Sequence, residues 1–366
     1  MRHILLHSCS LLLLMLICIG CSSAPSVPVG TSNRYAKGFD LQDSADCCIV
    51  TVYSPWNRTE VQARYVVSEA AKDAVRPISR WAVSSCTHVG MLDALHLRDS
   101  LVGVCLPELV YADLTHTLGA KNGHLDLGDP MQLSVERVLA AQPEAMMLTV
   151  YSPDDHTATN LQALGVQVIY NNEWMENHPL GRAEWIRLLG VLTGKRHEAD
   201  SLFETVVVRY DYLLQVVPAC QKRTFQPPSI VSGQDFRGTW YVPSGATYMG
   251  QLFHDAGASY HYENDQHEGS IPLTMEQALR DFADADVWVG VNAHTVLELE
   301  QASAKHTWLQ AFQNQRVYNF MGRTNQQGAN DFWERGVVHP DELLEDLIHV
   351  LYNDSAESLL YMQQLL

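Results

Sequence analysis

The chain has 366 residues, of which 46% are hydrophobic, and it carries 42 acidic against 24 basic side chains, giving a formal net charge of -18. A surface with this excess of negative charge is soluble and repels polyphosphate backbones, which argues against binding to DNA or RNA. Roughly 330 residues after a leader are more than one ordinary hydrophobic core organises, so we expect two lobes.

The first twenty residues are typical of an export signal. Residues 2–3 give a positive start, and an uncharged apolar run over residues 11–19 follows. A membrane-spanning helix needs roughly 20 apolar residues, so this shorter run indicates a secretory signal rather than a span. We therefore expect an exported, periplasmic protein.

The end of this segment suggests a lipid anchor. Cys18-Ile19-Gly20-Cys21 resembles the bacterial lipobox, whose last cysteine receives diacylglycerol after cleavage, although Cys18 stands where Leu is commonest. We expect lipidation at Cys21, with residues 21–34, rich in Ser, Pro and Gly, as a tether to the membrane. The alternative is an ordinary cleaved signal and a free soluble protein.

Five further cysteines follow Cys21, and an odd number cannot all pair. No CxxC spacing occurs, so we interpret them mostly as buried apolar residues rather than as a disulfide frame or a zinc site. Whether any disulfide forms among them stays open. They are Cys47, Cys48, Cys86, Cys105 and Cys220.

Strand-like runs alternate with helical periods along both halves of the chain, which predicts α/β lobes with parallel sheets covered by helices. In the first half we expect strands over 48–52, 80–84, 101–105, 145–150 and 166–170, and helices over 87–95, 134–141 and 157–164. In the second half we expect strands over 229–232, 287–291 and 316–319, and helices over 247–256, 274–282, 302–313 and 340–351.

One long helix is predicted between the halves. Apolar residues recur at three- and four-residue steps from Ala199 to Val217, which is one stripe of an uninterrupted helix. From residue 195 to 217 it would run roughly 35 Å, with Pro218 as its end and a preceding helix over 183–192. Such a helix can join two lobes as a strut and limit their hinge motion. The alternative is a long surface helix of a single domain.

Several segments carry a family resemblance by their order and spacing. They include 80–88, 92–95, 101–104, 127–128, 134–144, 256–258, 273–279, 283–288, 316–318 and 328–334, with Trp240 near the opening of the second half. Together they resemble the periplasmic binding proteins of the iron-siderophore and vitamin B12 group. The opening at 35–39 and the ending at 330–333 look like the lipoprotein versions found in Bacteroidetes.

This resemblance implies two Rossmann-like lobes with parallel central sheets, joined by a single long interdomain helix. We expect a signal peptide over 1–20, a tether over 21–34, an N-terminal lobe over 35–181, linking helices over 182–217 and a C-terminal lobe over 218–366. The implied function is the substrate-binding lipoprotein of an ABC importer. It would capture a ferric siderophore, haem or cobalamin and deliver it to a permease and its ATPase.

Loops after the predicted strands are rich in aromatic and hydrogen-bonding side chains. Ligands of such sheets bind at the carboxyl ends of strands, where two edges would face each other across a cleft. Flat aromatic faces suit a bulky chelate, and Arg suits its acidic groups. For each residue the alternative is loop packing or a capping bond. The candidate contacts are Ser85, Thr87, His88, Tyr111, Tyr151, Trp174, Trp240, Tyr241, Asn292, Arg323 and Asn330.

Two glutamates have a different expected role. Glu136 and Glu276 each lie near the start of a predicted helix, one in each half. In the resembling family, one glutamate of each lobe docks on arginines of the permease, and two widely spaced carboxylates can set orientation and association rate. The alternative is two ordinary solvated helix charges.

The sequence also bears on three other classes of function. No GxSxG, HExxH or GxxxxGKS motif occurs, so we expect no enzyme activity, with a secreted enzyme as an alternative. The sixteen histidines raise the alternative of a receptor for bare zinc or manganese, although their spacing matches no compact ligand set. A surface adhesin or structural lipoprotein is a further alternative. We expect a monomer without a cofactor or resident metal, held to the membrane by its lipid only.

Overall fold

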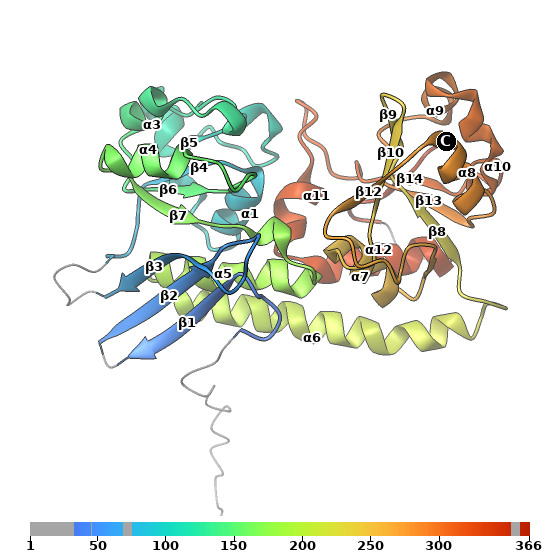
Figure 1. The fold of residues 1–366 in the computed structure, drawn as a ribbon, viewed down its shortest axis with the longest axis horizontal. Helices are drawn as coiled ribbons and strands as arrows, with labels where there is room; N and C mark the ends of the chain where they lie inside the picture. Colours follow the sequence, from blue (N-terminus) through green and yellow to red (C-terminus); the bar gives the residue numbers. More distant parts are fainter. Residues whose placement is uncertain (1–32, 45, 69–74, 353–358) are drawn as a thin grey trace, which may run out of the picture.

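The computed structural model describes residues 33–44, 46–68, 75–352 and 359–366. The predicted signal peptide, Cys21 and nearly all of the predicted tether lie outside the described residues. Two α/β halves lie side by side, and the long helix α6 runs beneath both of them (Figure 1). The predicted fold class is therefore confirmed.

The first half opens with an antiparallel sheet of three strands, of which only the one at 48–52 was predicted. Its strands are β1 (Phe39–Ser44), β2 (Cys47–Tyr53) and β3 (Val61–Val67), in the order β1-β2-β3. The strand predicted at 48–52 exists, but its partners lie in this sheet rather than in a parallel one. One face packs on the linking helices, where the Phe39 and Trp185 rings lie 4.9 Å apart.

The main sheet of this half is parallel, as predicted. It contains β4 (Trp81–Val83), β5 (Leu101–Val104), β6 (Ala145–Leu148) and β7 (Gln167–Tyr170), in the order β5-β4-β6-β7. Nearly every strand residue is buried, as expected for a sheet covered on both faces. The helices are α1 (Cys86–Ala94), α2 (Leu118–Asn122), α3 (Val135–Ala141) and α4 (Thr157–Ala163), with short turns η1 (Arg98–Ser100), η2 (Pro107–Leu109), η3 (Pro130–Gln132) and η4 (Glu173–Met175).

Two helices connect the halves, α5 (Pro179–Thr193) and α6 (Arg196–Gln221). The 26 residues of α6 correspond to about 39 Å at 1.5 Å each. Its buried stripe includes Phe203, Tyr210 and Val217, and it packs against α5 and against α12 of the second half. The predicted end at Pro218 is wrong. The helix includes Pro218 in its last turn and continues to Gln221, so the missing N–H of this proline does not end it.

The second half contains a five-stranded sheet and a small antiparallel one. The first has the order β11-β8-β13-β14-β15, from β8 (Ser229–Ser232), β11 (Ser259–Tyr260), β13 (Val287–Val289), β14 (Val317–Asn319) and β15 (Gln363–Gln364); only β15 runs antiparallel. The second has the order β12-β10-β9, from β9 (Asp235–Phe236), β10 (Thr239–Pro243) and β12 (Ser270–Leu273).

The helices of this half are α7 (Tyr248–Asp255), α8 (Met275–Phe282), α9 (Val296–Ala302), η5 (Ala304–Trp308), α10 (Gln310–Gln313), α11 (Asp331–Glu334), η6 (Arg335–Val337) and α12 (Pro340–Tyr352). The helices predicted over 247–256, 274–282 and 340–351 are present as α7, α8 and α12, whereas α9, α11 and η6 were not predicted. The single helix predicted over 302–313 is wrong. Leu309 is extended, with φ -73° and ψ 133°, and it separates η5 from α10.

A short segment of the second half crosses into the first. Helix α11 and turn η6 lie between the halves and pack against α1 (Figure 1). The close contact between α1 and α11 requires a glycine at position 90, because a Cβ there would lie 2.2 Å from the backbone oxygen of Glu334. This crossing brings the loop after β5 together with residues from the end of the chain.

The five cysteines named above are free thiols in the structure, and Cys48, Cys105 and Cys220 are buried. Within the part of the chain that the structure describes, no helix combines the length and apolar composition needed to cross a bilayer.

Candidate functional site

A cavity of about 690 Å³ lies between the two halves. Its walls form at the carboxyl ends of parallel strands, with Trp174 following β7, Ser232 ending β8, Gly290 following β13 and Phe320 following β14. Open α/β sheets bind ligands at this edge because successive loops diverge there and leave a crevice. This cavity is the candidate site.

Aromatic side chains from both halves line the cavity. Trp174 comes from the first half, and its ring centroid lies 5.8 Å from that of Tyr151. Phe320 and Trp333 come from the second half, where Phe320 stacks on Phe332 at 4.1 Å. Packed rings of this kind offer a rigid apolar surface at little cost in side-chain entropy. Tyr241 and Tyr248 add two further aromatic faces from the second half.

A buried ion pair lies beneath Tyr248. The Arg182 guanidinium on α5 contacts the Glu173 carboxylate at 2.6 Å, and its central carbon lies 4.2 Å from the centroid of the Tyr248 ring. Burial raises the pKa of Tyr248, and the neighbouring Arg182 charge opposes that rise. Residues of both halves and of the linking helix therefore meet in this cluster.

The N-terminal segment is tied to the same region by Glu176. This carboxylate, which is 2% exposed, accepts hydrogen bonds from the backbone N–H of Lys37 at 3.0 Å and of Gly38 at 2.8 Å, and from the Trp185 indole at 2.9 Å. Arg58, in the connection between β2 and β3, donates to the Met175 carbonyl at 2.5 Å. Lys37 and Arg58 consequently line the cavity.

Two predicted contacts are corrected by the structure. Trp240 is fully buried, stacks on Trp288 at 5.3 Å and donates its indole N–H to the Ser232 carbonyl. His88 is also fully buried and lies 3.2 Å from the Thr149 hydroxyl. Burial lowers the pKa of His88 to about 4, so it is a neutral core residue at pH 7. Neither side chain can touch a ligand in the cavity.

Three other predicted contacts make local hydrogen bonds at helix starts. The Ser85 hydroxyl caps α1 by accepting the Thr87 N–H at 3.2 Å, and the two hydroxyls lie 2.9 Å apart. Asn330 caps α11 by accepting the Phe332 N–H at 3.0 Å and donates to the Phe320 carbonyl at 2.7 Å. The capping interpretation accounts for these bonds, and none of the three side chains lines the central cavity.

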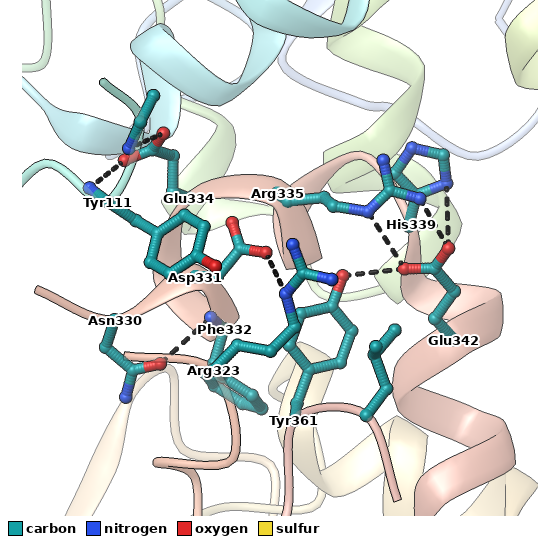
Figure 2. A network of polar contacts seen from close by, with 12 residues as sticks. Tyr111, Arg323, Asn330, Asp331, Phe332, Glu334, Arg335, His339, Glu342 and Tyr361 are labelled. Atoms are coloured by element: carbon teal, nitrogen blue, oxygen red, sulfur yellow. Dashed lines mark hydrogen bonds and ion pairs between the residues drawn. The ribbon is translucent and has the colours of Figure 1, made fainter. Parts of the chain in front are cut away.

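Tyr111 lines two other cavities, of about 620 and 690 Å³, and Arg323 lines the second of them. Arg323 pairs with Asp331 at 2.7 Å, and its guanidinium lies 5.4 Å from the Tyr111 ring centroid (Figure 2). Its charge is therefore committed to a partner from its own half rather than directed into the central cavity.

Glu334 and Asn325 of the second half form hydrogen bonds with the backbone around Tyr111 of the first half, and we call this group of bonds the clasp. The Glu334 carboxylate accepts the N–H groups of Tyr111 at 2.6 Å and Ala112 at 3.0 Å, as Figure 2 shows. The Asn325 amide donates to the carbonyls of Val110 at 3.1 Å and Tyr111 at 3.3 Å. Burial raises the pKa of Glu334 to about 7, although the two N–H groups favour its charged form.

The remaining predicted residues are exposed. Tyr241 lines the central cavity with 48% exposure, and Tyr151 supports Trp174. Asn292 donates its backbone N–H to the Gln234 side chain and does not line the cavity. Glu136 and Glu276 lie in the first turns of α3 and α8, in opposite halves (Figure 1), and Glu276 pairs with Lys305 at 2.7 Å.

Of the residues that line the cavity, only Trp174 and Tyr241 were predicted, and the unpredicted ones include Lys37, Arg58, Tyr248, Phe320 and Trp333. Phe320 and Trp333 had a usable signal, because Phe320 follows a predicted strand and Trp333 belongs to a recognised segment. Lys37 and Arg58 are held at the cavity by contacts with residues more than 110 positions away in the sequence. No local sequence pattern predicts such contacts. Among the described residues, no group of three or more His, Cys, Asp or Glu side chains is arranged to hold a metal ion.

Comparisons with known proteins agree with this architecture. The sequence pattern of the family described as periplasmic binding protein matches residues 82–323. An uncharacterised lipoprotein of Methanocaldococcus jannaschii is 22% identical over 290 residues, covering 76% of this chain. The match spans 66% of the length of that curated relative.

Solved structures share the fold at low sequence identity. A periplasmic haem-binding protein of Pseudomonas aeruginosa has a TM-score of 0.59 at 19% identity, covering 78% of this chain and 98% of its own. A protein of an ABC-type Fe3+-hydroxamate transport system from Saccharomonospora viridis has 0.58 at 18%, covering 82% and 97%. A periplasmic vitamin B12-binding protein of Vibrio cholerae has 0.57 at 14%, covering 77% and 99%.

Proposed function

This chain belongs to the periplasmic binding protein family, and we propose that it is the substrate-binding component of an ATP-driven importer that takes up a metal chelate. One observation carries the proposal, namely the cavity of about 690 Å³ between the halves, walled by aromatic side chains at the carboxyl ends of the strands. A cavity of this size lies within the range of roughly 300–1,000 Å³ that small-molecule sites occupy.

The chemistry of the walls supports a bulky, flat-faced solute. Trp174, Tyr241, Phe320 and Trp333 offer several ring faces around one space, which suits a macrocycle or a chelate with aromatic arms. Solved proteins of this fold are named for haem, for a ferric hydroxamate system and for vitamin B12. We therefore propose a ferric siderophore, haem or cobalamin as the solute, bound and released without covalent chemistry.

Delivery follows from the same proposal. Glu136 and Glu276 present exposed carboxylates from opposite halves, which suits two basic pockets on a permease. The proposed partners are that permease and its ATPase, with this chain as a monomer held in the periplasm by a lipid on Cys21. Replacing Cys21 with Ala should release the processed protein from membranes; a variant that stays membrane-bound would exclude lipidation there.

Isothermal titration tests the proposal. The purified chain is titrated with haemin, cyanocobalamin and a panel of ferric siderophores, and in parallel with zinc and manganese salts. We expect one chelate to bind with one-to-one stoichiometry. Tight binding of a free metal ion with no chelate bound would favour a bare-ion receptor instead. Hydrolysis of an ester or glycoside panel, with no solute bound, would favour an enzyme.

A further inference from the structure

The N-terminal sheet forms part of the central cavity although it lies outside the family pattern. The segment that contains β1 to β3 ends at residue 67, whereas the family match begins at residue 82. Lys37 precedes β1 and Arg58 lies between β2 and β3, and both line the cavity. They are the two basic residues among its lining residues. Both basic side chains of this cavity therefore come from an element outside the matched core.

Both residues are held at this position by contacts with one short stretch of the first half. The Lys37 N–H donates to the Glu176 carboxylate at 3.0 Å. One terminal nitrogen of Arg58 donates to the Met175 carbonyl at 2.5 Å, and the other lies 3.4 Å from the Glu176 carboxylate. Because these bonds run to the turn that also carries Trp174, the two cations and the aromatic wall form one unit.

The charges on this rim are not fully balanced. Glu176 also lines the cavity, but it is only 2% exposed, and its carboxylate pairs with Arg58 at 3.4 Å and accepts from the Gly38 N–H and the Trp185 indole. Lys37 is exposed and has no ion-pair partner among the described residues. The positive charge of Lys37 is therefore available to a solute on the side of the cavity that the first half forms.

The opposite wall has a different character. The second half contributes hydroxyl and amide side chains there, and its one acidic lining residue, Glu268, is exposed. An acidic group on a solute would be repelled by Glu268 and attracted by Lys37 and Arg58. Because the charges on the two walls differ in sign, an acidic group of a bound solute should lie on the side of Lys37 and Arg58.

We propose that Lys37 and Arg58 bind an oxyanion of the solute, so that the chain selects anionic chelates and orients them with the acidic end toward the N-terminal sheet. The apolar body of the solute then lies on Trp174 and Tyr241. Lysine serves as a point charge for such a group, and the planar guanidinium of arginine can add directed hydrogen bonds. This inference rests on the proposed function and adds to it the charge class and the orientation of the solute.

Binding measurements with charge variants test this inference. Haemin and ferric enterobactin serve as anionic probes, and ferrichrome and cyanocobalamin as probes without net negative charge. The variants are Lys37→Gln, Lys37→Arg and Glu268→Gln, with Lys121→Gln as a matched control because Lys121 is exposed on α2, away from this cavity. Lys37 is the better target, since Arg58 also bonds to the backbone.

We expect the wild type to prefer an anionic probe and Lys37→Gln to weaken its binding about tenfold, the scale of one charge-assisted hydrogen bond. Lys37→Arg should stay within about twofold of the wild type, because the charge is kept. Glu268→Gln should bind at least as tightly, and Lys121→Gln should behave as the wild type. Raising NaCl from about 50 to about 500 mM should weaken the wild type more than Lys37→Gln, because salt screens the charge.

Other results overturn the inference in distinguishable ways. If the wild type binds a chelate and Lys37→Gln binds it equally well, Lys37 does not recognise the solute. A wild type that prefers the uncharged probes refutes the selection of anions. If the wild type binds no chelate at all, the proposed function itself fails and this inference fails with it.

Discussion

The Glu334 carboxylate accepts the backbone N–H of Tyr111 at 2.6 Å across the boundary between the two halves of the chain. It also accepts the N–H of Ala112 at 3.0 Å, so one side chain satisfies two neighbouring donors of a loop that follows β5. Because Gly90 on α1 admits the backbone of Glu334 at close range, the bond and the packing hold the same junction. The halves are thus joined by this clasp as well as by α6.

Removing the clasp should destabilise the protein. Glu334→Ala leaves two N–H groups without their partner, and each unmet buried donor costs about 1–3 kcal/mol. We expect the free energy of unfolding, measured by urea denaturation, to fall by about 2–4 kcal/mol on that basis. Glu136→Ala, at an exposed site, should change it by less than about 0.5 kcal/mol. An unchanged midpoint in Glu334→Ala would show that solvent replaces the clasp without loss.

The same residue should give a pH dependence of stability. Burial raises the pKa of Glu334 from an ordinary 4.5 to about 7, so the folded state binds this proton more tightly than the unfolded state. Stability from this group is therefore complete below about pH 4.5 and is lost as the pH rises through 7. Burial also raises the pKa of Asp341 to about 6, with the same sign.

Two buried histidines act in the opposite direction. Burial lowers the pKa of His88 and of His339 to about 4. Their neutral forms therefore stabilise the folded state fully above the unfolded pKa near 6.5, and this stabilisation is lost as the pH falls through 4. The difference between wild type and Glu334→Gln isolates the glutamate, because the histidines are common to both. We expect that difference to shift in favour of the variant between pH 5 and pH 8. A difference that stays constant over this range would contradict the raised pKa.

The Arg182 and Glu173 pair offers a separate test of the cavity region. Arg182→Met leaves the buried Glu173 carboxylate without its cation, which typically costs about 3–5 kcal/mol. Arg182→Met with Glu173→Gln removes both charges, so it should recover much of that loss. Urea denaturation of both single variants and of the double variant measures the coupling. Additive losses would show that the two side chains do not support each other.

Glu136 and Glu276 can be tested by uptake. Replacing both with Ala should leave solute affinity unchanged and abolish import by cells, because both carboxylates are exposed and lie away from the central cavity. The control is Glu198→Ala with Glu300→Ala, two exposed glutamates on α6 and α9. Normal import by the Glu136 and Glu276 double variant would remove them from the docking surface.

The sequence predicts the fold correctly where strands are buried on both faces. Short apolar runs predict the strand at Ser229–Ser232 and the four strands β4 to β7. β1 and β3 were not predicted because polar residues interrupt them: Asp40 lies between the buried Phe39 and Leu41, and the exposed Arg64 precedes the buried Tyr65. Such half-buried strands look like loops when only apolar runs are sought.

The site was readable only in part. Trp240 and Tyr241 were both assigned to it, yet successive residues of a strand point to opposite faces, so Trp240 is fully buried and Tyr241 is 48% exposed. Choosing between them requires knowing which face of β10 is covered. Arg323 was assigned by its charge, and its pairing with Asp331 depends on the turn between β14 and α11, which no spacing rule predicts.

The central claim is that the cavity between the halves receives a chelate, and the crystal structure of the complex with the tightest-binding probe tests it most directly. The account predicts the chelate within contact distance of Trp174 and Tyr241, with an acidic group toward Lys37. A chelate seated instead beside Arg323 and Asp331, or bound outside both halves, would contradict it.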